Sequence, residues 1–302
     1  MNKTFLKYIF AFTLIGLSFY YLLFIISKDP KSISDLISNM PIPILIWAMT
    51  LSILGGISNT YVWFRINKNL APKTEFNVSY FAWSVSRIFR YIPGKAAGFI
   101  VRQKLQNSSV KHGIKTSVNE ILLTFMTISL LSTIYFLTNL QREYALHLLI
   151  LSIIIYCSIL FSKPTSIFFE LALSKLKIKI EANRLFTPPK QLFIHSLNGL
   201  PALLLHGASF FLLVKYGLDS HSVDFLYSTV TFYFSGIIGQ ISLIAPAGLG
   251  VREASLTFFM VNQGFNPEIA FIAALGSRVI LIASELINVF LSSLLRFYYS
   301  HD

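Results

Sequence analysis

The chain has 302 residues, of which 54% are hydrophobic and only 13% are charged, and its formal net charge is +12. A soluble domain carries about 25% charged residues, so this composition excludes a water-soluble globular protein and predicts an α-helical membrane protein. In such a protein the positive charge is expected to face anionic lipid headgroups rather than nucleic acid.

Long apolar runs separated by short polar stretches predict the membrane spans. A run of roughly 20 apolar residues crosses the hydrocarbon core as a helix. The first run follows Lys3 and Lys7, as in a secretory signal, but no small-residue cleavage pattern comes after it. We therefore interpret it as a retained helix, with a cleaved signal as the alternative. The predicted spans are residues 5–26, 42–64, 117–138, 144–162, 191–214 and 267–296.

The basic residues predict the orientation of the chain. If the N-terminus is cytoplasmic, the segments 65–116 and 163–190 are cytoplasmic too, and together they hold sixteen Lys and Arg residues against four in the opposite loops. The positive-inside rule then predicts that the N-terminus and the C-terminus both face the cytoplasm. The single cysteine, Cys157, lies in an apolar run, so we expect no internal disulfide and no Cys-based metal site.

Residues 78–106 and 222–263 are helices interrupted by a Pro- and Gly-containing break. Each half around the first break is too short to cross alone, so we expect a re-entrant hairpin whose tip is buried in protein or lines a wet cavity. Span, hairpin and span recur over about 42–138 and 191–296, which suggests an inverted repeat. Alternatively, 222–244 simply spans. The predicted fold class is all-α: one polytopic domain of six to eight membrane helices.

The first break, in the sequence Arg-Tyr-Ile-Pro-Gly-Lys, is strongly basic. Pro93 ends one helix, Gly94 permits the sharp turn, and Gly98 permits close packing of the next helix. Lys95 stands where the new helix begins, and helix N-termini bind anions. We predict a site for phosphate or carboxylate here, with charges that serve only topology as the alternative. The basic residues concerned are Arg87, Arg90, Lys95 and Arg102.

The second break reads Ala-Pro-Ala-Gly-Leu-Gly-Val-Arg-Glu. Pro246, Gly248 and Gly250 interrupt the helix and restart it. Glu253 is favourable at the new N-terminus because of the helix dipole, whereas Arg252 is unfavourable there unless it faces an anion or a carboxylate. Adjacent helical residues point about 100° apart, so we do not expect these two to pair with each other.

The last span carries Arg278 and Glu285, which are seven residues apart and therefore share one helical face. An ionisable residue at the bilayer centre costs at least about 2.5 kcal/mol, so each should face a cavity or a partner. Two turns is too far for direct contact in most rotamers, and Glu120 is one candidate partner. A structural salt-bridge network is the alternative to a substrate path. We expect His195, Asn198 and His206, which lie within the span 191–214, to pack or form hydrogen bonds inside the bundle. A proton relay is the alternative for the histidines.

The two breaks resemble the signatures of a known family. Arg90-x-x-Pro-Gly-Lys-x-x-Gly, with Arg102 and Glu120 downstream, resembles the first signature of the lysylphosphatidylglycerol synthase transmembrane-region family, whose members are also called flippase-like domain proteins. Pro246-x-Gly-x-Gly-Val-Arg-Glu, followed by Arg278, resembles the second, although it has Pro-Ala-Gly where the family has Pro-Gly-Gly. The resemblance covers nearly the whole chain and keeps the motif order.

This resemblance implies a bacterial or archaeal inner-membrane protein that moves or modifies envelope lipids or lipid-linked saccharides. In two-part members a soluble C-terminal domain transfers an amino acid, but this chain stops at Asp302, soon after the last span. We therefore expect a flippase-like translocase of an anionic lipid, without enzymatic activity, cofactor or metal. Arginines would hold the phosphate, and the glutamates that would hold those arginines are Glu120, Glu253 and Glu285.

Two other functions stay open at this point. A membrane transferase with a polyprenyl-phosphate donor would need a general base, and Glu253 or Glu285 would have to serve, since the sequence has no Asp-x-Asp motif. A non-catalytic subunit of an envelope-polysaccharide assembly is equally compatible with a polytopic bundle. In either case the chain could associate with itself or with an assembly partner.

Overall fold

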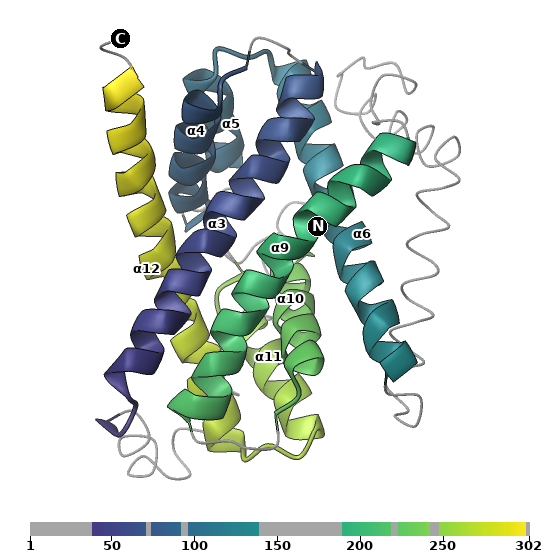
Figure 1. Ribbon diagram of the computed structural model, residues 1–302, viewed down its shortest axis with the longest axis vertical. Coiled ribbons are helices and arrows are strands. Elements are labelled where there is room, and N and C mark those ends of the chain that lie inside the picture. The colour runs from purple at the N-terminus through teal and green to yellow at the C-terminus, as the bar shows by residue number, and fades with distance from the viewer. Residues whose placement is uncertain are drawn as a thin grey trace, which may run out of the picture.

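The computed structural model describes six stretches of the chain, and every regular element within them is a helix (Figure 1). The all-α class is therefore confirmed. The predicted spans 5–26 and 144–162, nearly all of 163–190 and the tips of both hairpins, at 92–95 and 242–247, lie outside the described residues. The described stretches are residues 38–70, 74–91, 96–138, 189–218, 223–241 and 248–299.

Four helices in the described part of the chain are long and apolar enough to cross a membrane. Each covers one of the predicted spans. A helix of 29 residues is about 43 Å long and exceeds the hydrocarbon core of about 30 Å, so its ends reach the headgroups. The four are α3 (Ile42–Leu70), α6 (Val110–Thr138), α9 (Pro189–Leu212) with its π-helical continuation η3 (Leu213–Gly217), and α12 (Pro267–Tyr299).

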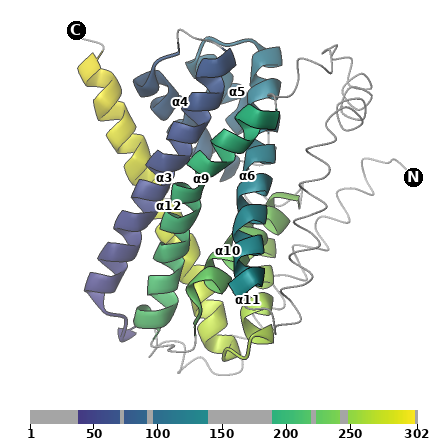
Figure 2. The ribbon, with the colours of Figure 1, turned by 45° about the vertical axis from the view of Figure 1, so that its right-hand side comes forward.

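Two pairs of shorter helices lie between the long ones. The first pair is α4 (Phe76–Ile88), which ends in the 3-10 turn η1 (Phe89–Tyr91), and α5 (Ala96–Leu105). The second pair is α10 (Phe225–Ile241) and α11 (Val251–Asn262). Figures 1 and 2 show the first pair at one end of the molecule and the second pair at the other. α10 ends where the described residues end, at 241, so re-entry of 222–244 stays a prediction, with a simple span as the alternative.

The order of span, hairpin and span occurs twice, in opposite directions. α3 runs toward the end that holds α4 and α5, and α6 leaves from that end (Figure 1). α9 runs toward the end that holds α10 and α11, and α12 returns from it. This is the arrangement that an inverted repeat describes, while the half-repeat limits at 42–138 and 191–296 stay a prediction.

Small residues bring the long helices close together at the centre of the bundle. A Cβ on Gly55 of α3 would lie 2.8 Å from the ring of His206 on α9, and a Cβ on Gly56 would lie 2.6 Å from the amide of Asn288 on α12. Because lipid tails are as apolar as leucine, helices in a membrane associate through close packing of this kind. The outward faces expose large apolar side chains instead, such as Trp47 on α3 and Phe290 on α12.

The first hairpin closes at Gly98, where α5 packs directly on α4. A Cβ on Gly98 would lie 2.7 Å from the backbone oxygen of Ser86. A backbone atom in a helix cannot rotate aside as a flexible side chain can, so a larger residue would force the two arms apart. The spacing between the arms is therefore set by a residue without a side chain.

Replacement of Gly98 with alanine should lower the stability of the purified protein by about 1–3 kcal/mol, because the added methyl overpacks the hairpin. A thermal melt in detergent measures this. Gly236 is the matched control, since it is also helical and a Cβ there would meet nothing within 4 Å. Gly236→Ala should raise stability by up to about 1 kcal/mol through helix propensity. Equal melting temperatures for the two variants would contradict the close packing.

Candidate functional site

The first helix break places two arginines on the way into the hairpin. Arg87 is in the last turn of α4, and Arg90 lies in the 3-10 turn that follows it. A 3-10 turn tightens the end of a helix and changes the direction of its side chains. The residues predicted to form the break itself, Pro93, Gly94 and Lys95, lie outside the described residues. Anion binding by Lys95 at the start of α5 therefore stays a prediction.

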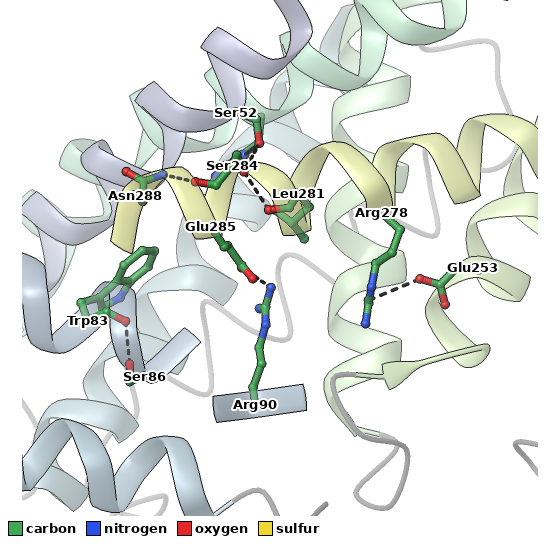
Figure 3. A network of polar contacts seen from close by, with 11 residues as sticks. Ser52, Trp83, Ser86, Arg90, Glu253, Arg278, Leu281, Ser284, Glu285 and Asn288 are labelled. Atoms are coloured by element: carbon green, nitrogen blue, oxygen red, sulfur yellow. Dashed lines mark hydrogen bonds and ion pairs between the residues drawn. The ribbon is translucent and has the colours of Figure 1, made fainter. Parts of the chain in front are cut away.

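Arg90 forms an ion pair with Glu285 of α12, as Figure 3 shows. The two residues are 195 positions apart in the chain. The side chain of Arg90 is 27% exposed, whereas that of Glu285 is 9% exposed. The pair therefore lies at the edge of the packed interior, with the arginine on the more accessible side.

At the second break, glycines and a glutamate shape the start of α11. Gly248 has φ +69° and Gly250 has φ +78°, in the left-handed region that favours glycine. Gly248 also lies so close to Gly239 of α10 that a Cβ would come within 2.6 Å of its backbone. The amide of Gly250 donates a hydrogen bond of 2.8 Å to the carboxylate of Glu253, which caps the new helix. Pro246 lies outside the described residues.

Glu253 also forms an ion pair with Arg278 of α12, at 3.3 Å. Both side chains are deeply buried, at 5% and 7% exposed respectively. The carboxylate of Glu253 thus caps the first turn of α11 and also neutralises an arginine from another helix. As expected from the helix geometry, Glu253 does not pair with its neighbour Arg252.

α12 therefore connects the two breaks. Figure 3 shows Glu285 reaching toward Arg90 of the first hairpin and Arg278 reaching toward Glu253 of the second. The spacing of seven residues puts both charges on one helical face. The sequence indicated that each needed a separate partner, but it suggested only Glu120, which lies elsewhere.

Glu120 of α6 pairs with Arg102 of α5 instead, at 2.6 Å. The other oxygen of Glu120 accepts a hydrogen bond from the indole of Trp83, at 3.3 Å. Arg102 in turn donates through Nε to the hydroxyl of Ser86, at 3.0 Å, and lies over the ring of Trp63. These contacts join both arms of the first hairpin to α3 and α6, so Arg102 and Glu120 brace the hairpin.

The two remaining arginines stack on aromatic rings. The guanidinium of Arg87 lies 4.3 Å from the centroid of the Trp83 ring, and that of Arg252 lies 4.6 Å from the centroid of Phe232. Within the described residues no carboxylate lies within ion-pairing distance of Arg87, and its buried Nε has no hydrogen-bond acceptor. Stacking stabilises a desolvated cation but leaves the N–H groups at the guanidinium edge available to an anion.

A chain of neutral polar groups runs beside the ion pairs. Ser52 of α3 shares a hydrogen bond of 2.9 Å with Ser284 of α12 and approaches the ring of His206 at 3.4 Å. Asn288, one turn beyond Ser284, accepts a hydrogen bond of 2.6 Å from the hydroxyl of Tyr80 on α4. The proton relay considered for His206 stays a prediction. Apart from the position of His206, these contacts could not be predicted, because single hydroxyls in apolar runs have no distinctive spacing.

The charged residues around the two breaks are predominantly basic. Five arginines and three glutamates gather around the two breaks, and each glutamate is already engaged by an arginine. Within the described ranges no group of three or more His, Cys, Asp and Glu side chains could hold a metal ion. The arginines, in contrast, present planar donors suited to phosphate and carboxylate oxygens.

Comparison with known families gives one match. The model of the family described as "Lysylphosphatidylglycerol synthase TM region" matches residues 8–284. The match includes both breaks and Arg278 of α12, and it ends one residue before Glu285. No curated protein matches the chain.

Removal of one partner from the buried pair should destabilise the protein more than removal of both. Arg278→Met leaves the carboxylate of Glu253 buried without its countercharge and should cost about 3–5 kcal/mol. The double variant Arg278→Met with Glu253→Gln should recover a large part of that loss, as measured by thermal melts in detergent. Arg102→Met serves as the comparison, because its partner is more exposed and the loss should be smaller. Additive losses in the double variant would contradict a direct pair.

Proposed function

This chain belongs to the lysylphosphatidylglycerol synthase transmembrane-region family, and from that premise we propose that it moves an anionic phospholipid or lipid-linked saccharide across the bacterial inner membrane. The family match supports a membrane lipid-related function. In this proposal the acyl chains stay in the bilayer, while the anionic headgroup passes between the two hairpins along α12.

The observation that carries the proposal is the excess of arginine at the two breaks. Arg87, Arg90, Arg252 and Arg278 face these breaks with Glu253 and Glu285 as countercharges. An isolated ion loses several kcal/mol or more when it leaves water, so a further negative charge at the cluster would stabilise it. A lipid phosphate supplies that charge and is available throughout the membrane surface.

Arg87 is the arginine that we assign to the first contact with the headgroup. Its guanidinium is fixed by the Trp83 ring, and the absence of a carboxylate partner among the described residues leaves its donors for a ligand. A fixed guanidinium loses little conformational freedom when it binds an anion, which favours binding. At the second break Arg252 is likewise stacked on an aromatic ring, that of Phe232.

The two alternatives gain no support from the geometry of the glutamates. A transferase would use Glu253 or Glu285 as a general base, but each carboxylate is held in an ion pair with an arginine and is not directed at a substrate. The translocase therefore accounts for more of the site than the transferase does, and the assembly subunit stays an alternative.

We further infer that the end of the bundle with α4 and α5 faces the cytoplasm. The C-terminal end of α12 lies at this same end (Figure 1), so the C-terminus would be cytoplasmic, as would the N-terminus by the positive-inside rule. Residues at the two ends that are exposed and suitable for labelling are Lys104 and Asn262.

Cysteine labelling in intact cells tests the orientation. After Cys157→Ser, the variant Asn262→Cys should react with a membrane-impermeant maleimide from outside the inner membrane, and Lys104→Cys should react only after permeabilisation. The reverse pattern would overturn the proposed orientation.

Neutralisation of Arg87 should slow lipid movement. In proteoliposomes that contain a fluorescent phosphatidylglycerol, the rate at which the label becomes inaccessible to an external quencher should fall about tenfold or more in Arg87→Gln, since a charge-assisted hydrogen bond contributes about 1.5–3 kcal/mol. Lys104→Gln is the matched control: Lys104 is an exposed cation on the adjacent helix, and the variant should move lipid at the wild-type rate. Equal rates in wild type, Arg87→Gln and protein-free vesicles would exclude the proposed function.

A further inference from the structure

The ion pairs of α12 carry an inference that rests on the proposed function and concerns how the same site handles its substrate. We propose that Glu285 and Glu253 are internal stand-ins for the lipid phosphate, so that Arg90 and Arg278 form two successive anion stations on either side of the bundle centre. A phosphate would enter by displacing the carboxylate from its arginine and leave when the carboxylate returns.

The charges at the two breaks support a pair of equivalent stations. The first station combines Arg87 and Arg90 with Glu285, and the second combines Arg252 and Arg278 with Glu253. Each set has two positive side chains and one negative one. A phosphodiester with a single negative charge would balance the formal charge of either named set, whereas a pyrophosphate would exceed it.

α12 contributes the carboxylate to one ion pair and the guanidinium to the other. At the first station the glutamate is on α12 and the arginine is on the hairpin, whereas at the second the arginine is on α12 and the glutamate is on the hairpin. α12 can therefore release the first hairpin with its glutamate and receive the anion with its arginine. This reversal gives one helix a role at both ends of the transfer.

The distance between stations fits a single step of the headgroup. Residues seven apart on a helix are separated by about 10 Å along its axis, which is about a third of the hydrocarbon thickness. A phosphate that moves from Arg90 to Arg278 would thus cross the most apolar part of the membrane while an arginine is always within reach.

The two stations differ in accessibility. Arg90 is 27% exposed, whereas Arg278 and Glu253 are almost fully buried. The first station is therefore open to an arriving headgroup and the second is closed. After the phosphate has passed from its first contact, Arg87, to Arg90, Glu285 keeps a countercharge within the same station, because Arg87 lies one turn earlier on the hairpin and has no carboxylate of its own among the described residues.

A binding measurement tests the stand-in role directly. The full chain in detergent is titrated with dioctanoyl phosphatidylglycerol, a short-chain lipid with one negative charge. Glu285→Gln removes the competing carboxylate and should lower the Kd about tenfold, which corresponds to about 1.4 kcal/mol. Glu75→Gln is the matched control, because Glu75 is an exposed carboxylate at the start of α4 without a side-chain cap hydrogen bond, and its Kd should equal that of wild type. An unchanged or higher Kd in folded Glu285→Gln overturns the proposal.

A second variant keeps the test valid if Glu285→Gln does not fold. Glu285→Asp retains the charge but shortens the side chain by one methylene, so its hold on Arg90 weakens and the Kd should fall by a smaller factor. A higher or unchanged Kd in Glu285→Asp would also overturn the stand-in role. A structural role alone predicts lower stability in both variants without tighter binding.

Transport kinetics separate this inference from the proposed function. In proteoliposomes Glu285→Gln should lower both the half-saturating lipid fraction and the maximum rate, because the carboxylate that expels the phosphate is missing. If wild type moves lipid but Glu285→Gln does not lower the half-saturating lipid fraction and the maximum rate together, the inference fails and the proposed function stands. If wild type moves no lipid yet Glu285→Gln binds the probe more tightly, the anion station stands and the proposed function fails.

Discussion

Two ion pairs on one face of α12 join this helix to both hairpins. A charged side chain in a low-dielectric interior requires a countercharge, and loss of one partner leaves a charge that the interior cannot solvate. Glu285 holds Arg90 of the first hairpin, and Arg278 holds Glu253 of the second. The hairpins enter from opposite ends of the molecule, so this one helix face sets where they meet. Much of the polar centre is arranged around that requirement.

The breaks themselves depend on a second constraint, the need of backbone groups for hydrogen bonds where lipid offers none. At the start of α11, Glu253 accepts a hydrogen bond from the amide of Gly250 and so satisfies a group that the helix leaves open. Gly248 and Gly239 permit the close approach of α10 and α11. The same carboxylate therefore serves the backbone and the arginine of α12, which couples the shape of the break to the charge of the site.

Aromatic rings and hydroxyls complete the polar centre without adding charge. The rings of Trp83 and Phe232 stack on the guanidinium groups of Arg87 and Arg252. These cation–π contacts lower the desolvation cost of the cation at each break. Ser52, Ser284 and Asn288 join α3 to α12 through hydrogen bonds beside the ion pairs. These hydroxyls and the amide are buried in the packed contact between the two helices. Aromatic stacking and ion pairs explain how a chain with few charges can hold several of them inside its helices.

The sequence by itself determined the helical membrane class, four of the long helices and the family, because these depend on local properties: run length, helix breakers and the order of two motifs. It also placed Arg278 and Glu285 on one face, since seven residues make two turns. Only the tertiary structure decided their partners. Glu285 lies 195 positions from Arg90, and Glu120, the partner suggested for the last span, pairs with Arg102. Periodicity states which way a side chain points, but the neighbour it meets depends on how distant helices pack.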